Sequence, residues 1–367
     1  MNHRILASLA LVLAITVAGF SGPSPRESLH VLAPITHGNL TIFPVVGGPE
    51  YDTSRFLTLD EGTRAGSVVV TEQGSLQGLV RHGQPVNRHS GAEVNQLVLI
   101  NNSDRPLLLL AGEIVTGGKQ DRVIGADRLV PPKSDPIDLS VFCVEPGRWV
   151  GHSEQFSSLK SQMAQPSVRV PAMAAKDQQQ VWNQVASARE ALQAKSVTDG
   201  AGGAVAGIPH TSSYAVTAAA KPVQQTIDRV ADYDGLLREL RKVNAKGVVV
   251  AVHGQLVWAD LFASNDLLSR YWQKLARSYA AESLTAVSTG AQATQQSAQA
   301  FLDRLSGNRE IVETDPGVYR RAEISGDGYK VFTLTALMPK AGFDVHIAKM
   351  TYADGPGQKL QPYGLIR

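Results

Sequence analysis

The strongest constraint in this sequence is a change in the period of its apolar residues near position 151. From 40 to about 149, short β-branched runs alternate with turn residues such as Gly117-Gly118. Such runs predict antiparallel β structure, in a sandwich or a half-open barrel. After position 151 the apolar residues recur at helical spacing, first over 156–163 and then over 181–192. The two periods together predict a chain of mixed class.

The later part of the chain alternates between the same two patterns. Helical periods cover 223–243 and 265–284, and short strand-like runs cover 320–324, 329–334 and 343–349. Strands at both ends around a helical middle favour an α+β protein over an alternating parallel one. The predicted fold is an antiparallel β-sandwich-like N-terminal half, a helical middle and C-terminal antiparallel strands.

These patterns divide the chain into consecutive segments. We expect a signal peptide over 1–21, a flexible N-terminal segment over 22–39, a β-rich half over 40–150, an α+β half over 151–350 with a flexible loop at 199–220, and a tail over 351–367.

The first residues have the layout of an export signal. Arg4 precedes an apolar run of 14 residues, from Ile5 to Ala18, and small and turn-forming residues follow it. A helix of that length spans about 21 Å, short of a hydrocarbon core of roughly 30 Å, which favours cleavage over permanent anchoring. The sequence therefore predicts a periplasmic or secreted protein with no stable membrane span after cleavage.

Composition narrows the function classes. The single cysteine, Cys143, cannot form an internal disulfide, so an apolar core must stabilise the fold, and 43% hydrophobic residues in 367 are enough for one. A formal charge of +2 gives no reason to expect nucleic acid as a partner. The nine histidines show no metal-binding spacing, so no metal site is predicted, and no cofactor motif is found.

The best candidate for ligand binding is the turn from Gly117 to Arg122. Two glycines allow close backbone approach, and Lys119 and Arg122 add an ammonium and a guanidinium, with Gln120 between them. Exposed N–H groups and cations of this kind can bind a phosphate or carboxylate. The alternative is a plain hairpin turn whose charges face water.

A second group of polar residues closes the β-rich half. Glu145, Arg148 and Trp149 flank a Pro-Gly turn, and Glu113 lies at the end of an apolar strand. These glutamates either form structural salt bridges, Glu113 with Lys119 or Arg122, or share a polar pocket over the turn. In a shared pocket they are the catalytic candidates, as acid and base. Cys143 lies in an apolar run and is expected to be buried and inert.

Three stretches carry a family resemblance. They are Ala111-Gly112-Glu113 through Gly117-Gly118-Lys119-Gln120-Asp121-Arg122, Cys143-Val144-Glu145-Pro146-Gly147-Arg148-Trp149, and Asp260-Leu261-Phe262 followed by Tyr271-Trp272. The chain resembles the ARG and rhodanese-phosphatase-superfamily-associated protein family over about 40–349. The resemblance implies no particular reaction. The family name implies an association with ADP-ribosylglycohydrolase-type enzymes, and hence a link to ADP-ribose or related nucleotides.

Three functional hypotheses follow, and the sequence leaves open whether the protein is an enzyme. The leading one is an exported binding or accessory module for an anionic small molecule or a protein partner. The second is a hydrolase of a phosphate- or ribose-containing substrate that uses Glu113 and Glu145. The third is a structural partner in an envelope assembly.

Overall fold

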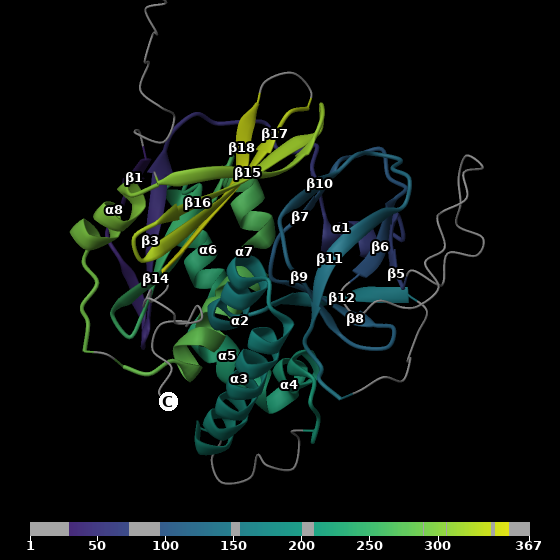
Figure 1. Cartoon of the computed structure of the whole chain (residues 1–367). Helices are drawn as coiled ribbons and strands as arrows, with labels where there is room; N and C mark the ends of the chain where they lie inside the picture. The colour runs from purple at the N-terminus through teal and green to yellow at the C-terminus, as the bar shows by residue number, and fades with distance from the viewer. Residues whose placement is uncertain are drawn as a thin grey trace, which may run out of the picture.

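A computed structural model describes residues 29–72, 96–147, 155–199, 209–288, 290–305, 307–338 and 342–351 of the chain. Its strands form a large sheet, a small closed barrel and a three-stranded sheet, and its helices pack between and around them (Figure 1). None of the described helices is both long enough and apolar enough to cross a membrane.

The large sheet has nine strands, taken from both ends of the chain. They are β1 (Leu29–Val31), β2 (Ile35–His37), β3 (Leu40–Gly47), β13 (Gly247–Val252), β14 (Gln255–Phe262), β15 (Asn308–Asp315), β16 (Tyr319–Gly326), β17 (Tyr329–Ala336) and β18 (Phe343–Thr351). The order β1-β3-β13-β14-β18-β17-β16-β15 is antiparallel throughout, and β2 also pairs with β3.

The barrel closes in the order β11-β6-β5-β12-β8-β9. Its strands are β5 (Val68–Thr71), β6 (Gln96–Asn101), β8 (Glu113–Gly117), β9 (Arg122–Ile124), β11 (Ile137–Cys143) and β12 (Gln155–Met163). The three-stranded sheet holds β4 (Leu57–Thr58), β7 (Leu107–Leu109) and β10 (Arg128–Val130).

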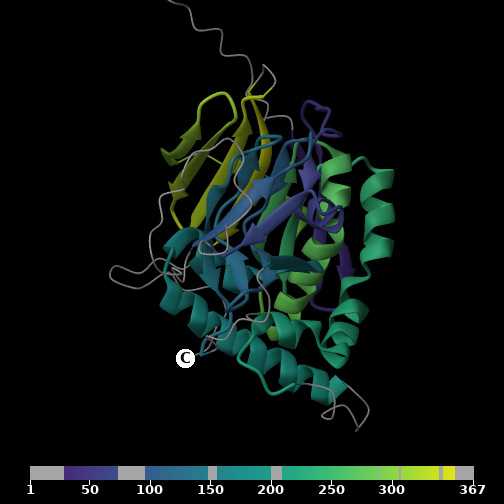
Figure 2. The same cartoon turned by 90° about the vertical axis from the view of Figure 1, so that its right-hand side faces the viewer.

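Helices fill the space between the barrel and the large sheet. They are α1 (Leu59–Arg64), α2 (Pro166–Val170) with the π-helical turn η2 (Pro171–Ala175), α3 (Gln178–Asp199), α4 (Tyr214–Ala219), α5 (Lys221–Ala231), α6 (Tyr233–Lys242), α7 (Asn265–Thr285) and α8 (Gln295–Asp303). Figure 2 shows the long helices along one side and one end of the strands.

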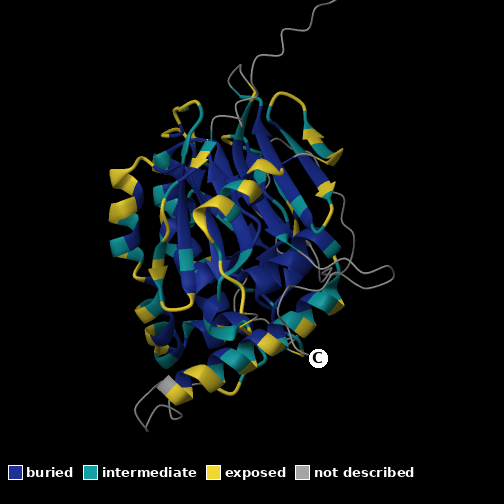
Figure 3. Cartoon of the chain, turned by 90° about the vertical axis from the view of Figure 1, so that its left-hand side faces the viewer, coloured by how far each residue is buried: buried dark blue, intermediate teal, exposed yellow. Residues whose placement is uncertain are grey.

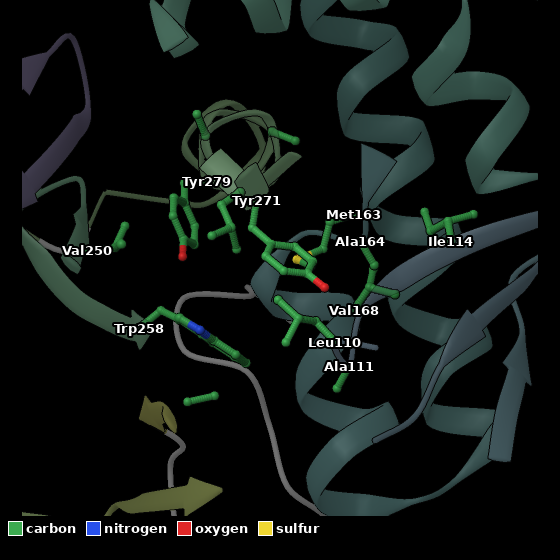
Figure 4. Packing of buried hydrophobic residues seen from close by; sticks show 14 of the residues in the cluster. Leu110, Ala111, Ile114, Met163, Ala164, Val168, Val250, Trp258, Tyr271 and Tyr279 are labelled. Atoms are coloured by element: carbon green, nitrogen blue, oxygen red, sulfur yellow. The ribbon is translucent and has the colours of Figure 1, made fainter. Parts of the chain in front are cut away.

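Helix α7 is the centre of the main core. It begins after Ser264, whose side chain accepts from the N–H of Leu267, and most of its residues are buried. Tyr271 and Tyr279 extend from it between Trp258 of β14 and the apolar residues of the barrel side, among them Leu110 (Figure 4). The helix thus carries side chains that reach both β units.

The two faces of the large sheet are buried in different ways. On β13, Val248 and Val250 face the helical core, while Val249 faces a second apolar cluster with Phe301 of α8. This alternation follows from the two-residue period of a strand. Figure 3 shows buried residues concentrated in the strands and exposed ones on loops and outer helix surfaces.

Helix α8 also covers the outer edge of β1. The N–H of Val31 donates to Gln299 Oε1 at 2.7 Å, and Gln299 Nε2 donates to the carbonyl of Leu29 at 3.2 Å. Gln295 Nε2 donates to the carbonyl of Val31 at 2.8 Å. Two side-chain amides therefore satisfy backbone groups that an adjacent strand would otherwise bind.

The predicted α+β class is confirmed, as are the C-terminal strands and the hairpin around Gly117-Gly118. The first half closes into a barrel, and β3 leaves it for the large sheet. The segment 22–39, predicted to be flexible, contains β1 and β2. The predicted loop at 199–220 contains α4, and its residues 200–208 lie outside the described part of the chain, as do the predicted signal peptide over 1–21 and the tail over 352–367.

One helix prediction is wrong. Residues 155–163 form strand β12, because this segment pairs with both β5 and β8 and closes the barrel. The apolar spacing within the segment fits a helix, but the backbone hydrogen bonds of two neighbouring strands decide its conformation.

Candidate functional site

The Gly117-Gly118 turn is occupied by carboxylates of the protein itself. The N–H of Lys119 donates to Glu72 Oε1 at 3.1 Å, and the N–H of Gly117 donates to Asp121 Oδ1 at 3.3 Å. Gly118 has a φ of +51°, and a Cβ there would lie 2.3 Å from the ring of Phe156. The turn therefore needs glycine for close packing, and its N–H groups already bind anionic oxygens.

Glu145 lies against this turn. The N–H of Asp121 donates to Glu145 Oε2 at 3.2 Å, and Gln120 Nε2 donates to the carbonyl of Glu145 at 3.1 Å. Arg122 is buried, and its Nη1 donates to the carbonyl of Asp121 at 3.4 Å. The structure thus brings Glu145, Gln120 and Arg122 together in a packed cluster. Arg148 and Trp149 lie outside the described residues.

Glu113 has other partners. Its Oε1 accepts from Lys274 Nζ of α7 at 2.7 Å, and its Oε2 accepts from the N–H of Leu110 at 2.7 Å. Lys274 Nζ also lies 2.7 Å from Asp60 Oδ2. Burial raises the pKa of Glu113 despite the ammonium beside it, since Lys274 is shared with a second carboxylate. The structural salt bridge expected for Glu113 exists, but its partner is Lys274 rather than Lys119 or Arg122.

Cys143 is buried, as predicted. Its Sγ donates to the carbonyl of Glu145 at 3.3 Å, and burial raises the pKa of the thiol above its ordinary value. A thiol held in its protonated form is a poor nucleophile, so the residue acts as a small core side chain.

A buried network of charges joins the barrel to the large sheet. Its members, called the junction network here, are Asp127, His346, Asp260, Arg169 and Tyr279. His346 Nδ1 lies 2.6 Å from Asp127 Oδ2 and its Nε2 lies 3.1 Å from Asp260 Oδ1. Asp260 also accepts from Arg169, at 3.3 and 3.4 Å, and from the hydroxyl of Tyr279.

The network is electrically balanced. Burial opposes the charge on His346, but Asp127 and Asp260 outweigh it and raise the pKa of the imidazole to about 9. Burial likewise opposes the charge on Asp260, yet Arg169 and His346 hold the pKa of its carboxyl below the ordinary value. Two carboxylates therefore face one imidazolium and one guanidinium. Such an arrangement stabilises a junction between two structural units.

The surroundings of Arg169 fix its position. The guanidinium carbon lies 4.2 Å from the ring centroid of Trp258, and the backbone of Gly112 passes alongside. A Cβ on Gly112 would lie 2.7 Å from Arg169 Nε, and the φ of +97° there also favours glycine. This explains physically why an Ala-Gly-Glu stretch precedes β8.

Part of this network was visible in the sequence. Asp260 lies within one of the stretches that carry the family resemblance, and His346 alternates with apolar residues on a predicted strand. Asp127 and Arg169 gave no such signal, because single charged residues near turns are common. Their meaning depends on contacts between segments far apart in the chain.

The largest cavity described lies on the outer face of the large sheet and is called the mouth cavity here. It has a volume of about 390 Å³. Its lining residues are Leu29, Val45, Gly47, Gly48, Pro49, Tyr51, Lys246, Leu261, Phe262, Ala263, Arg309, Arg320, Thr335, Gly342, Phe343, Asp344 and Ile347. Leu29 and Arg309 belong to the two ends of the strand order, so the sheet curls until both edges face one space.

The mouth cavity is positively charged. Lys246, Arg309 and Arg320 are opposed only by Asp344, so three cations and one carboxylate leave a formal charge of +2 on the lining. Within the described part of the chain, Arg309 and Arg320 make no ion pair, and Arg320 Nε is buried without a hydrogen-bond partner. These guanidiniums have donors available for an anion.

A second cavity, of about 380 Å³, lies between the barrel and the hairpin of β15 and β16. Asp127, Asp138, Arg128, Glu313 and Arg321 contribute its charged lining. Its ion pairs are made within the protein: Arg321 Nη2 lies 3.0 Å from Glu313 Oε2, and Arg128 Nη2 lies 3.9 Å from Glu313 Oε1. No group of three potential metal ligands occurs among the residues that the structure describes.

Comparison with known proteins gives a family and no closer relative. Searches of curated proteins and of solved structures each found no match to this chain. A model of the ARG and Rhodanese-Phosphatase-superfamily-associated Protein domain matches residues 28–350, which include every residue of the junction network and of the mouth cavity. This match covers most of the 367 residues, and the chain belongs to that family.

Proposed function

We propose that this protein is a binding module for a small anionic molecule and that the mouth cavity holds the ligand. The observation that carries the proposal is the pair Arg309 and Arg320, which line a cavity of about 390 Å³ without an ion-pair partner among the described residues. Guanidiniums bind carboxylate and phosphate through two parallel hydrogen bonds, which makes them suited to such ligands.

The mouth cavity is a better site than the predicted turn at Gly117–Arg122. In the turn, Glu72, Asp121 and Glu145 already accept the available backbone N–H groups. A ligand anion would have to displace these carboxylates and leave them buried without partners, which costs several kcal/mol by the usual estimates, roughly 1–3 per group. At Arg309 and Arg320 no such exchange is needed.

The hydrolase hypothesis has less support. Glu113 and Glu145, the predicted acid and base, are both buried, and neither lines either of the two cavities described above. They bind different groups, Glu113 the ammonium of Lys274 and Glu145 the N–H of Asp121. A shared catalytic pocket would require both to reach one substrate.

The surface favours a small ligand over a protein partner. The exposed large hydrophobic residues among those described are Val197, Val216, Val243, Val287 and Ile311. They belong to five separate segments, whereas protein-binding surfaces usually gather apolar residues in one patch. Export from the cytoplasm stays a prediction from the first 21 residues.

The test is a titration of the protein with inorganic phosphate at constant ionic strength, followed by heteronuclear NMR. We expect saturable shifts in residues around Arg309 and Arg320, and a roughly tenfold or greater loss of affinity in Arg309→Gln and Arg320→Gln, since a hydrogen bond to a charged group contributes about 1.5–3 kcal/mol.

Arg321→Gln is the matched control. Arg321 follows Arg320 directly on β16 but lines the second cavity, on the other side of the strand. Its substitution should leave phosphate affinity unchanged. Equal affinities in the parent protein and Arg320→Gln, or a loss of binding in Lys119→Ala, would contradict the proposal.

A further inference from the structure

The floor of the mouth cavity is apolar. Val45, Leu261 and Ile347 line it and are also members of the cluster that packs against α8. Because the sheet curls, α8 covers one part of this face and leaves the adjoining part open at the cavity. The floor is thus a continuation of a hydrophobic core that no described helix covers.

An aromatic wall stands beside this floor. The rings of Tyr51 and Phe343 are stacked, with centroids 4.3 Å apart and planes inclined by 10°. Phe56 meets the other side of Phe343 edge-on at 6.5 Å. Packing from both sides holds the Phe343 ring in place, so the wall exists before any ligand binds.

The positive charge of the cavity is one-sided in effect. Lys246 Nζ is already bound by the carbonyls of Gly48 and Pro49, at 2.7 and 2.8 Å, and lies 3.6 Å from a carboxylate oxygen of Glu50. Asp344 accepts from the hydroxyl of Thr335 at 2.7 Å. Among the described cations of the lining, the guanidiniums on β15 and β16 keep unused donors.

From this asymmetry we infer that the ligand is an amphiphilic anion, with one carboxylate or phosphate head on Arg309 and Arg320 and an aliphatic body over Val45, Leu261 and Ile347. The inference rests on the proposed function and adds the ligand class. A purely polar anion would use the guanidiniums but leave the apolar floor in contact with water. A body of methylene groups removes that contact and gains the free energy of apolar burial.

The test is a homologous series of n-alkyl phosphates, from methyl to octyl, titrated below their micelle concentrations by calorimetry. Each buried methylene should increase affinity roughly fourfold, the equivalent of about 0.8 kcal/mol, until the chain outgrows the cavity. A parallel series of n-alkyl carboxylates distinguishes the two heads, since the series with the matching head should bind more tightly at every chain length.

A variant isolates the apolar part. Phe343→Ala removes the aromatic wall and should reduce the gain per methylene while leaving methyl phosphate affinity within about twofold, since the guanidiniums are untouched. Ile311→Ala is the control, because Ile311 is exposed on β15 and does not line the cavity. Thermal melting of both variants shows whether either change acts through stability.

The outcomes separate this inference from the proposed function. An affinity that does not change with chain length, while inorganic phosphate still binds through Arg320, overturns the amphiphilic ligand and leaves the anion-binding module standing. The absence of binding by every phosphate and carboxylate overturns both. A steady rise with chain length that Phe343→Ala flattens supports the inference.

Discussion

The junction network and the mouth cavity use the same side-chain chemistry in opposite states of pairing. In the junction network, Arg169 is fully buried and its guanidinium is matched by Asp260. In the mouth cavity, Arg309 and Arg320 lie at the surface of a hollow and have no carboxylate partner among the described residues. The comparison shows how one molecule separates charges that hold its parts together from charges left available to a ligand.

The difference follows from the cost of burial. A buried guanidinium without a counterion loses its hydration and receives nothing in return, so it persists only when paired. A guanidinium in an open cavity keeps water as a partner until a ligand replaces it. Charge pairing therefore predicts function here better than the presence of a charged residue does.

The largest effect that can break this comparison comes from Asp260→Asn. The change leaves Arg169 and His346 buried with insufficient negative charge, and we expect a loss of about 3–5 kcal/mol in the free energy of unfolding, measured by urea denaturation. Asp344→Asn, in the mouth cavity, should cost less than about 1 kcal/mol. Similar losses in the two variants would erase the distinction between the regions.

A second effect depends on pH and belongs to the junction network alone. His346 has a pKa of about 9 in the folded protein against an ordinary value of 6.5. Its contribution is fully present below pH 6.5 and is lost as the pH rises through about 9, a change of roughly 3 kcal/mol in the free energy of unfolding.

Urea denaturation between pH 6 and 9.5 measures this dependence. His346→Gln should be less stable than the parent at pH 6 and should lack most of the decline above pH 7. A parent protein whose stability stays level over this range would show that the imidazole is neutral, and the charge balance described for the network would then be incorrect.

The smallest effect sharpens the comparison within two consecutive residues. Arg320→Gln should change the free energy of unfolding by no more than about 0.5 kcal/mol, because its guanidinium makes no ion pair with the described residues. Arg321→Gln should cost up to about 1 kcal/mol, because Arg321 lies 3.0 Å from Glu313. Ligand affinity should show the reverse order, which a titration of both variants checks.

The sequence predicted local structure better than assembly. The helix at 265–284 and the C-terminal hairpins follow from apolar periods and turn residues, and both are present. Closure of the barrel and the pairing of β3 with β13 join segments about 200 residues apart. Nothing in a local pattern encodes such pairing, which is also why the helical spacing within β12 misled.

The candidate site divides in the same way. Glu145 and Gln120 do meet at the glycine turn, as adjacent turns in one barrel allow. Arg309 and Arg320 resemble any arginines on exposed strands, and only the curvature of the sheet and the lack of a nearby carboxylate give them significance. Both are properties of the assembled molecule rather than of a motif.

The two glutamines of α8 have a consequence for self-association. The outer edge of β1 would normally offer its N–H and carbonyl groups to the strand of another molecule. Gln295 and Gln299 bind these groups at residues 29 and 31 with their own amides, in the manner of a short neighbouring strand. A second copy of the chain finds no free template there, so the sheet stops at this edge without a proline, a bulge or a charged gatekeeper.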